Sequence, residues 1–273
     1  MWVHSGDALD RAPGGAPCAE SPASGRHGDE DVRVAIKVRQ VVERIPVVGP
    51  AARRLVMAVL ARSDLKIRDS AAYWEKRYQS GGNSGAGSYD RLAEFKAAFL
   101  NDFVRTRNVQ EILEFGCGDG SQLALAQYPH YVGCDVSTAA VEMCRRRFAD
   151  DPTKQFYPVP GLPADLTAEL VLSLDVIYHL VEDAVFDRYM ADLFDRATRF
   201  VVVYSSNTDQ PAAALHVRHR TFTDWIDGHR PQWTLVEHVA NPYPYDENQP
   251  KTTSFADFFV YERAAGADLP GVS

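Results

Sequence analysis

The chain has 273 residues, of which 45% are hydrophobic and 24% charged, a composition that excludes fibrous and wholly disordered proteins. No stretch approaches the ~20 apolar residues that cross a bilayer, no secretory signal is visible, and the four cysteines form no CxxC pair. We therefore expect a cytoplasmic protein without a disulfide framework or zinc ribbon. The net charge of −8 gives no general attraction to nucleic acid, so no nucleic-acid partner is expected.

The N-terminal part divides into two segments of different composition. Residues 1–31 are rich in Ala, Pro, Gly and Ser, so we expect a disordered tail. Residues 32–70 are predicted to form a basic amphipathic helical extension, since the stretch 32–68 holds nine basic and two acidic residues. Two interpretations of this extension stay open: a helix pair that packs on the domain or forms a dimer contact, and an element that lies peripherally on a membrane surface.

Residues 71–263 alternate strand and helix patterns, which predicts one α/β domain with a parallel sheet. The predicted strands of this sheet are 111–115, 131–135, 155–159, 169–174 and 199–204. The predicted helices between them are 120–127, 139–148 and 183–195. Two later strands, 233–240 and 255–262, suggest an antiparallel addition to the sheet edge, and residues 264–273 are expected to form a flexible tail.

The strongest motif is EFGCGDG at residues 114–120, between a predicted strand and a predicted helix. Glycines at alternate positions permit a tight turn and let a ligand approach the backbone closely. The next predicted strand ends in Asp135, whose carboxylate can accept hydrogen bonds from ribose hydroxyls. Asp119 inside the loop disfavours a pyrophosphate, which GxGxxG loops bind, and favours a cationic ligand such as a sulfonium with an α-amino group.

This order of strand, glycine loop, helix, strand and acid resembles motif I and the following acid of the class I S-adenosylmethionine-dependent methyltransferases. The resemblance covers about residues 73–262 and implies a Rossmann-like, doubly wound, mostly parallel seven-stranded sheet, with S-adenosylmethionine as cofactor. The acid that this family often carries after its third strand has no match in register here, with Asp165 as the nearest candidate. The cofactor-binding residues implied by the resemblance are Tyr73, Glu114, Gly116, Cys117, Gly118, Asp119, Gln122, Asp135, Val136, Ser137 and Leu174.

Motif IV of the same family, beside the transferred methyl, would correspond to LSLDVIYHLVED at residues 172–183. His179 is the first candidate for a general base, because an imidazole can take a proton near neutral pH. The alternative is that His179 only closes the cofactor pocket or caps the next helix. Further catalytic candidates are Asp175, His216 and His219, and the candidates for acceptor binding are Tyr178, Glu182 and Asn207. Asp175 and Glu182 are also candidate oxygen ligands for Mg²⁺, with solvated loop acids as the alternative.

An aromatic helix containing Tyr73, followed by a glycine-rich stretch at 81–87, precedes the first strand of the domain. In the resembling family this region commonly covers the cofactor, so we interpret it as a lid, against the alternative of an ordinary packed helix and linker.

The predicted activity is S-adenosylmethionine-dependent O-methylation of a sugar, an oligosaccharide or a similar polar small molecule. The segments expected to line the acceptor pocket are rich in His, Asp, Asn, Ser and Tyr, which suits a polyol. The chain is also similar to small actinobacterial saccharide and natural-product O-methyltransferases. Methylation of a small amine and a non-catalytic S-adenosylmethionine-binding partner subunit remain as alternatives.

Overall fold

The computed structural model describes residues 69–212 and 214–264. The predicted tail at 1–31, the extension at 32–70 up to residue 68, and the C-terminal tail from residue 265 lie outside the described residues. No helix in the described part of the chain is long and apolar enough to cross a membrane.

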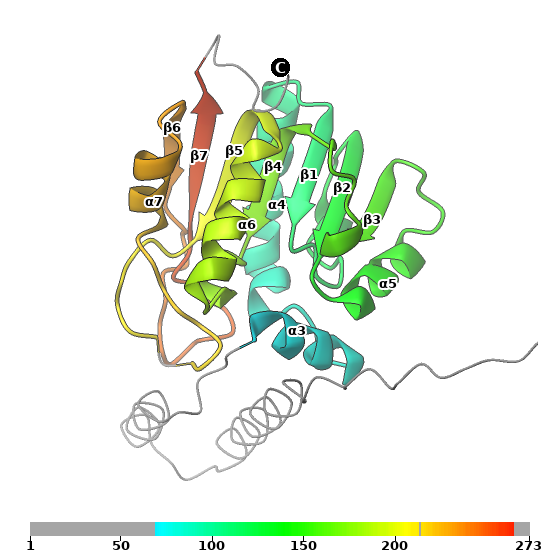
Figure 1. Cartoon of the computed structure of the whole chain (residues 1–273). Helices are drawn as coiled ribbons and strands as arrows, with labels where there is room; N and C mark the ends of the chain where they lie inside the picture. The colour runs from blue at the N-terminus through cyan, green and yellow to red at the C-terminus, as the bar shows by residue number, and fades with distance from the viewer. Residues whose placement is uncertain (1–68, 213, 265–273) are drawn as a thin grey trace, which may run out of the picture.

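A seven-stranded sheet lies between two layers of helices (Figure 1). Its strands are β1 (Glu111–Phe115), β2 (His130–Asp135), β3 (Lys154–Pro158), β4 (Ala168–Leu174), β5 (Ala197–Ser205), β6 (Trp233–Val239) and β7 (Asp257–Arg263). The spatial order is β3-β2-β1-β4-β5-β7-β6, with β7 antiparallel to both of its neighbours and all other pairs parallel. The predicted doubly wound, mostly parallel sheet is therefore confirmed, and its order reverses direction between β1 and β4, where such sheets bind ligands.

The helices lie on both faces of this sheet because alternate strand side chains point to opposite sides. In β5, Phe200, Val202 and Tyr204 pack with the layer formed by α4 and α5, whereas Val201 and Val203 pack with α6 and α7. The helices are α3 (Ser70–Gln79), α4 (Asp90–Thr106), α5 (Thr138–Arg147), α6 (Asp183–Asp195) and α7 (Phe222–His229). Figure 1 shows α3 outside these two layers, running past the carboxyl ends of the strands.

The prediction of a helix at 120–127 is wrong. Only one short 3-10 turn, η2 (Leu123–Leu125), forms between the glycine loop and β2. Pro129 follows closely and disfavours helical backbone at the residue before it, which leaves little chain for a helix. The longer α4 packs beside this connection instead, and its Asn101 Oδ1 accepts the Gln127 N–H at 2.8 Å.

Candidate active site

A cavity of about 270 Å³ lies at the carboxyl ends of β1, β2 and β4, and residues of α3 form part of its wall. It therefore lies at the point where the strand order reverses. The predicted site residues that line this cavity are Glu114, Gly116, Cys117, Gly118, Gln122, Asp135, Val136, Leu174, Asp175, His179 and Glu182.

The glycine loop forms the floor of the cavity with its backbone. Gly116 and Gly118 have φ angles of +84° and +56°, in the left-handed region that favours glycine. A Cβ atom on Gly116 would lie 2.4 Å from Cγ2 of Val176, and one on Gly118 would lie 2.3 Å from Oγ of Ser84. Side chains are thus excluded from this floor, and a ligand there meets peptide groups.

Asp135 lies at the end of β2 and is only 6% exposed. Its Oδ2 accepts the Gly118 N–H at 3.0 Å and its Oδ1 accepts the Ser137 N–H at 2.8 Å. Burial raises the pKa of Asp135 to about 6, although both backbone hydrogen bonds oppose that rise. Ser137 does not line the cavity, because its hydroxyl accepts the Ala140 N–H at the start of α5.

Glu114 lies on β1 and is 4% exposed. Its Oε2 accepts a hydrogen bond from the Tyr131 hydroxyl at 2.6 Å. Burial raises the pKa of Glu114 to about 7, and the Tyr131 hydroxyl and the Lys96 ammonium limit that rise. The cavity therefore holds two carboxyl groups, those of Glu114 and Asp135, that ionise between weakly acidic and neutral pH.

Asp119 does not line the cavity and connects the glycine loop to the segment that follows α3. Its carboxylate accepts hydrogen bonds from Ser84 N at 2.9 Å, the Tyr89 hydroxyl at 2.7 Å and Ser121 N at 2.9 Å. The Asp119 N–H in turn donates to Ser84 Oγ at 3.0 Å. Burial alone would raise the pKa of Asp119, but these hydrogen bonds lower it below its ordinary value.

The helix α3 contributes Trp74 and Tyr78 to the cavity wall. The Tyr78 hydroxyl lies 3.0 Å from Ser84 Oγ, so the helix and the following segment are joined at the glycine loop. Tyr73 does not line the cavity, because it is buried with its ring stacked on His216 at a centroid distance of 5.2 Å. The segment interpreted as a lid thus lies against the cavity, and Trp74 and Tyr78 of its aromatic helix line the ligand space.

His179 lines the cavity at the end of the short turn η4 (Ile177–His179). Its Nδ1 lies 2.9 Å from the His216 carbonyl oxygen. A carbonyl can only accept, so Nδ1 carries the proton and Nε2 carries the lone pair of the neutral ring. The His179 ring also makes an edge contact with Trp74, at a distance of 4.8 Å between ring centroids, and stacks on His216 at a centroid distance of 5.3 Å. These contacts fix the orientation of the ring.

Asp175 is bound to a lysine that the sequence analysis did not select. Its Oδ2 lies 2.5 Å from the Lys96 ammonium, and its Oδ1 accepts the Tyr178 hydroxyl at 2.8 Å. Lys96 belongs to α4 and is 1% exposed. The signal for it was a lysine among Leu92, Ala93, Ala97 and Leu100, on the apolar face of a helix.

The described residues do not support the candidate magnesium site. Asp175 is engaged with Lys96 and Tyr178, and Glu182 Oε1 accepts the Ser70 N–H at 2.7 Å. Within residues 69–212 and 214–264, no group of three or more His, Cys, Asp or Glu side chains is arranged to hold a metal ion. The two predicted ligands are thus occupied with protein partners.

Comparison with known proteins relates part of the domain to a known family. Residues 113–201 match the family model described as a methyltransferase domain. The match covers about a third of the chain and includes most of β1 and all of β2, β3 and β4 of the sheet. The comparison with curated proteins found no match.

Solved methyltransferase structures of low sequence identity share the fold of this domain. The N-methyltransferase NodS from Bradyrhizobium japonicum WM9, in complex with S-adenosyl-L-homocysteine, is 15% identical with a TM-score of 0.56, over 71% of this chain and 99% of NodS. The magnesium protoporphyrin IX methyltransferase ChlM from Synechocystis PCC 6803, with bound S-adenosylmethionine, is 14% identical with a TM-score of 0.53, over 72% of this chain and 98% of ChlM.

Besides Tyr73, Asp119 and Ser137, four further predicted residues do not line the cavity. Tyr178 is buried beneath Asp175, and His216 is held between Tyr73 and His179. The other two, His219 and Asn207, hydrogen-bond to other protein residues. His219 Nδ1 lies 2.7 Å from Ser206 Oγ, and both amide atoms of Asn207 hydrogen-bond to Thr223.

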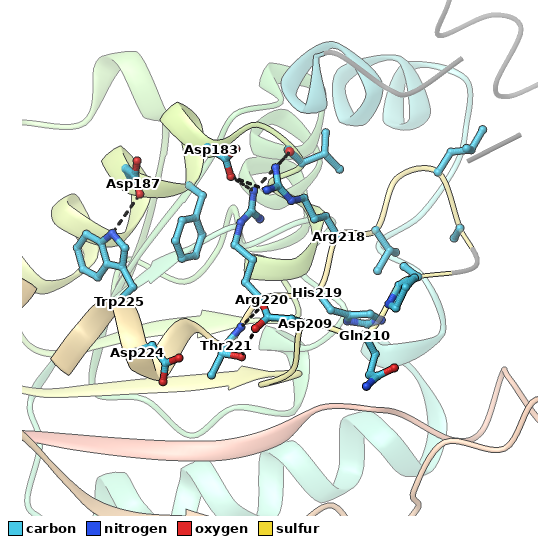
Figure 2. A pocket seen from close by; sticks show the side chains of 17 residues that line it. Asp183, Asp187, Asp209, Gln210, Arg218, His219, Arg220, Thr221, Asp224 and Trp225 are labelled. Carbon is cyan, nitrogen blue, oxygen red and sulfur yellow. Dashed lines mark hydrogen bonds and ion pairs between the residues drawn. The ribbon is translucent and has the colours of Figure 1, made fainter. Parts of the chain in front are cut away.

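A second, wider hollow of about 990 Å³ lies between α6, α7 and the segment that follows β5 (Figure 2). Its charged groups largely bind one another. Asp183 pairs with Arg218 at 2.8 Å and Arg220 at 3.2 Å, while Asp187 accepts the Trp225 indole N–H at 3.0 Å. His219 lines this hollow and not the cavity that holds His179. The fold thus places two of the histidine candidates, His179 and His219, in different hollows.

Proposed function

We propose that the chain transfers a methyl group from S-adenosylmethionine to a hydroxyl of a polar small molecule, with a sugar or saccharide as the acceptor class. The observation that carries this proposal is His179, an oriented imidazole with its Nδ1 donating to the His216 carbonyl in the wall of the glycine-loop cavity.

The cavity fits the proposed cofactor. The side-chain-free floor at Gly116 and Gly118 suits the methionine portion, and the buried Asp135 carboxylate suits the ribose hydroxyls. Val136, which is 46% exposed, offers an apolar surface for the adenine. Gln122 Oε1 is buried without a hydrogen-bond partner in the described part of the chain, as expected for an acceptor that a ligand satisfies.

Bound S-adenosylmethionine supplies a methyl group already activated by its sulfonium, so the protein mainly needs to align the acceptor. A hydroxyl acceptor must also lose its proton. The lone pair on Nε2 of His179 can receive that proton, and the His216 carbonyl stabilises the resulting imidazolium through Nδ1. Glu182 and Asp175 give the same cavity wall a polar character that suits a polyol.

An amine acceptor is the alternative, and NodS, which shares the fold, is named as an N-methyltransferase. An amine that enters as the free base needs no dedicated protein base. Replacement of His179 therefore discriminates between the two acceptor classes.

We expect His179→Gln to lower kcat by about 10²–10⁴-fold with little change in the affinity for S-adenosylhomocysteine. The reaction is followed as S-adenosylhomocysteine release and acceptor mass increase with a panel of free sugars, glycosides and amines. The wild-type pH–rate profile should rise through the histidine pKa, and the variant should lose that limb. A variant that turns over a hydroxyl acceptor at the wild-type rate contradicts the proposed base.

A non-catalytic binding subunit is separated from an enzyme by the same panel. Calorimetry of S-adenosylhomocysteine establishes binding first. Binding without methyl transfer to any acceptor class would favour the non-catalytic alternative.

A further inference from the structure

Lys96 is the most deeply buried cation in the described part of the chain, with 1% of its surface exposed. Burial of an ammonium group is costly unless a partner compensates it. The partner is Asp175 Oδ2 at 2.5 Å, and the aromatic face of Tyr204 lies 5.2 Å from Nζ. Burial raises the pKa of Glu114 on β1, and the Lys96 charge limits that rise, so the lysine acts on Glu114 as well as on Asp175, which follows β4.

Asp175 is the residue at which β4 becomes the loop that carries His179. Its φ angle is +60°, a left-handed conformation that is uncommon outside glycine. The side chain is held at both oxygens by Lys96 and Tyr178, and the Asp175 N–H donates to the Tyr204 carbonyl at 2.9 Å. These three contacts hold the left-handed backbone conformation of Asp175, because a change in that conformation would break all of them.

The same contacts extend to His179. Tyr178, which donates to Asp175, immediately precedes His179, and the His179 N–H closes the turn on the Val176 carbonyl at 2.7 Å. Gly87, in the glycine-rich stretch after α3, lies close to Asp175. A Cβ atom added to Gly87 would be only 2.7 Å from Asp175 Oδ2. The Lys96–Asp175 pair is thus enclosed by the His179 loop and the lid.

A buried ion pair alone is weak evidence of function, because apolar residues can often replace one without loss of stability. Three observations go beyond stability here. Both Lys96 and Asp175 line the cavity, Asp175 adopts a left-handed backbone, and its second oxygen holds the neighbour of His179.

We infer that Lys96 is a positioning residue for methyl transfer: by anchoring Asp175 it fixes the loop that places His179 in the cavity. The inference rests on the proposed function and adds to it a residue on a different element, α4. Lys96 acts through Asp175 and Tyr178 and takes no proton itself.

The test is Lys96→Met in the full chain, a substitution that keeps the length of the side chain and removes its charge. The first readout is the NMR signal of His179 Cε1–H and its pH titration, assigned by its loss in His179→Gln. We expect the signal to shift and its titration to move. We also expect kcat to fall by about 10²-fold, the scale of a misplacement near 1 Å, with little change in S-adenosylhomocysteine affinity.

Lys154→Met is the matched control. It breaks a Lys–Asp pair with Asp151 that does not line the cavity, so the His179 signal and kcat should stay at the wild-type values. An unchanged His179 signal in Lys96→Met overturns the inference.

The double variant Lys96→Met with Asp175→Asn separates positioning from stability. It removes both charges, so Tm should recover toward the wild-type value while the His179 signal and kcat remain altered. Recovery of all three would reduce Lys96 to a structural residue and overturn the inference. A wild-type chain that binds no S-adenosylhomocysteine would overturn the proposed function and this inference together, whereas an unmoved signal in a chain that binds it overturns only the inference.

Discussion

At the scale of single residues, the cavity is distinguished by carboxyl groups whose pKa values lie near neutrality. Burial raises the pKa of Glu114 to about 7 and that of Asp135 to about 6. A raised carboxyl pKa means that the folded state favours the protonated form. The corresponding contribution to stability is present below the unfolded pKa and is lost as the pH rises through the folded value. Ionisation of Glu114 and Asp135 thus lowers the free energy of unfolding at neutral pH. A bound ligand that donates hydrogen bonds to the ionised carboxylates can offset this loss.

Affinity for S-adenosylhomocysteine should therefore depend on the ionisation of Asp135. Ribose hydroxyls donate to the ionised carboxylate, so affinity should fall by about fivefold between pH 6 and pH 5 for a pKa of about 6. Glu114 is already protonated across that window, because its pKa is about 7. Calorimetry of Asp135→Asn should show binding weaker by about 1.5–3 kcal/mol at pH 7 and no fall between pH 6 and pH 5. Wild-type affinity that does not change with pH would contradict the ribose assignment.

Gly116 and Gly228 offer a matched pair of glycine substitutions. A Cβ on Gly116 would lie 2.4 Å from Val176 Cγ2 at a φ of +84°, whereas one on Gly228 in α7 meets no atom within 4 Å. Gly116→Ala should lower Tm and abolish measurable S-adenosylhomocysteine binding, as thermal melts and calorimetry would show. Gly228→Ala should raise stability by about 0.5–1 kcal/mol, since alanine is the better helix former. Equal effects of the two substitutions would contradict the described loop geometry.

At the scale of elements, the strands and helices that were predicted correctly are those with a periodic pattern in their own residues. The five parallel strands and the helices α5 and α6 were predicted within one or two residues, because buried strands and amphipathic helices have distinct periodicities. The helix expected at 120–127 failed because α4, earlier in the chain, packs beside that connection. Lys96 was missed for a related reason. Its partner Asp175 is 79 residues away, and a contact across that separation leaves no local pattern.

The predicted lid, α3 and residues 80–89, is the element whose attachment to the domain can be tested most directly. Ser84 Oγ accepts the Asp119 N–H and contacts the Tyr78 hydroxyl, so Ser84→Ala removes one connection of the segment 80–89 to the glycine loop and one to α3. At about 0.5–1.5 kcal/mol for each hydrogen bond, deuterium exchange of residues 80–89 should rise by about tenfold or more. Affinity for S-adenosylhomocysteine should fall in parallel. Ser80→Ala is the control, because its hydroxyl bonds only to Lys76 at the end of α3, and exchange that rises equally there would contradict the attachment.

At the scale of the whole molecule, charge is distributed unevenly along the chain. The net charge is −8, yet the segment 32–68 carries +7, which leaves −15 for the remainder. The basic segment precedes an acidic remainder in the sequence, and this suits two kinds of contact. The segment could bind an acidic surface of this chain or of a second copy, or it could bind anionic lipid. Cosedimentation with anionic vesicles, with and without residues 32–68, distinguishes these interpretations.

The last prediction concerns residues 1–31. From Ala12 to Gly25 every residue except Cys18 and Glu20 is Ala, Pro, Gly or Ser, a composition that cannot bury enough apolar surface to offset the entropy of ordering. Deletion of residues 1–31 should therefore leave Tm, S-adenosylhomocysteine affinity and turnover at the values of the full chain. Deletion of residues 1–68, measured in parallel, reports what the basic segment 32–68 adds to Tm, S-adenosylhomocysteine affinity and turnover. A lower Tm or turnover in the shorter deletion would show that residues 1–31 bind to the domain, and a change confined to the longer one would assign that role to residues 32–68.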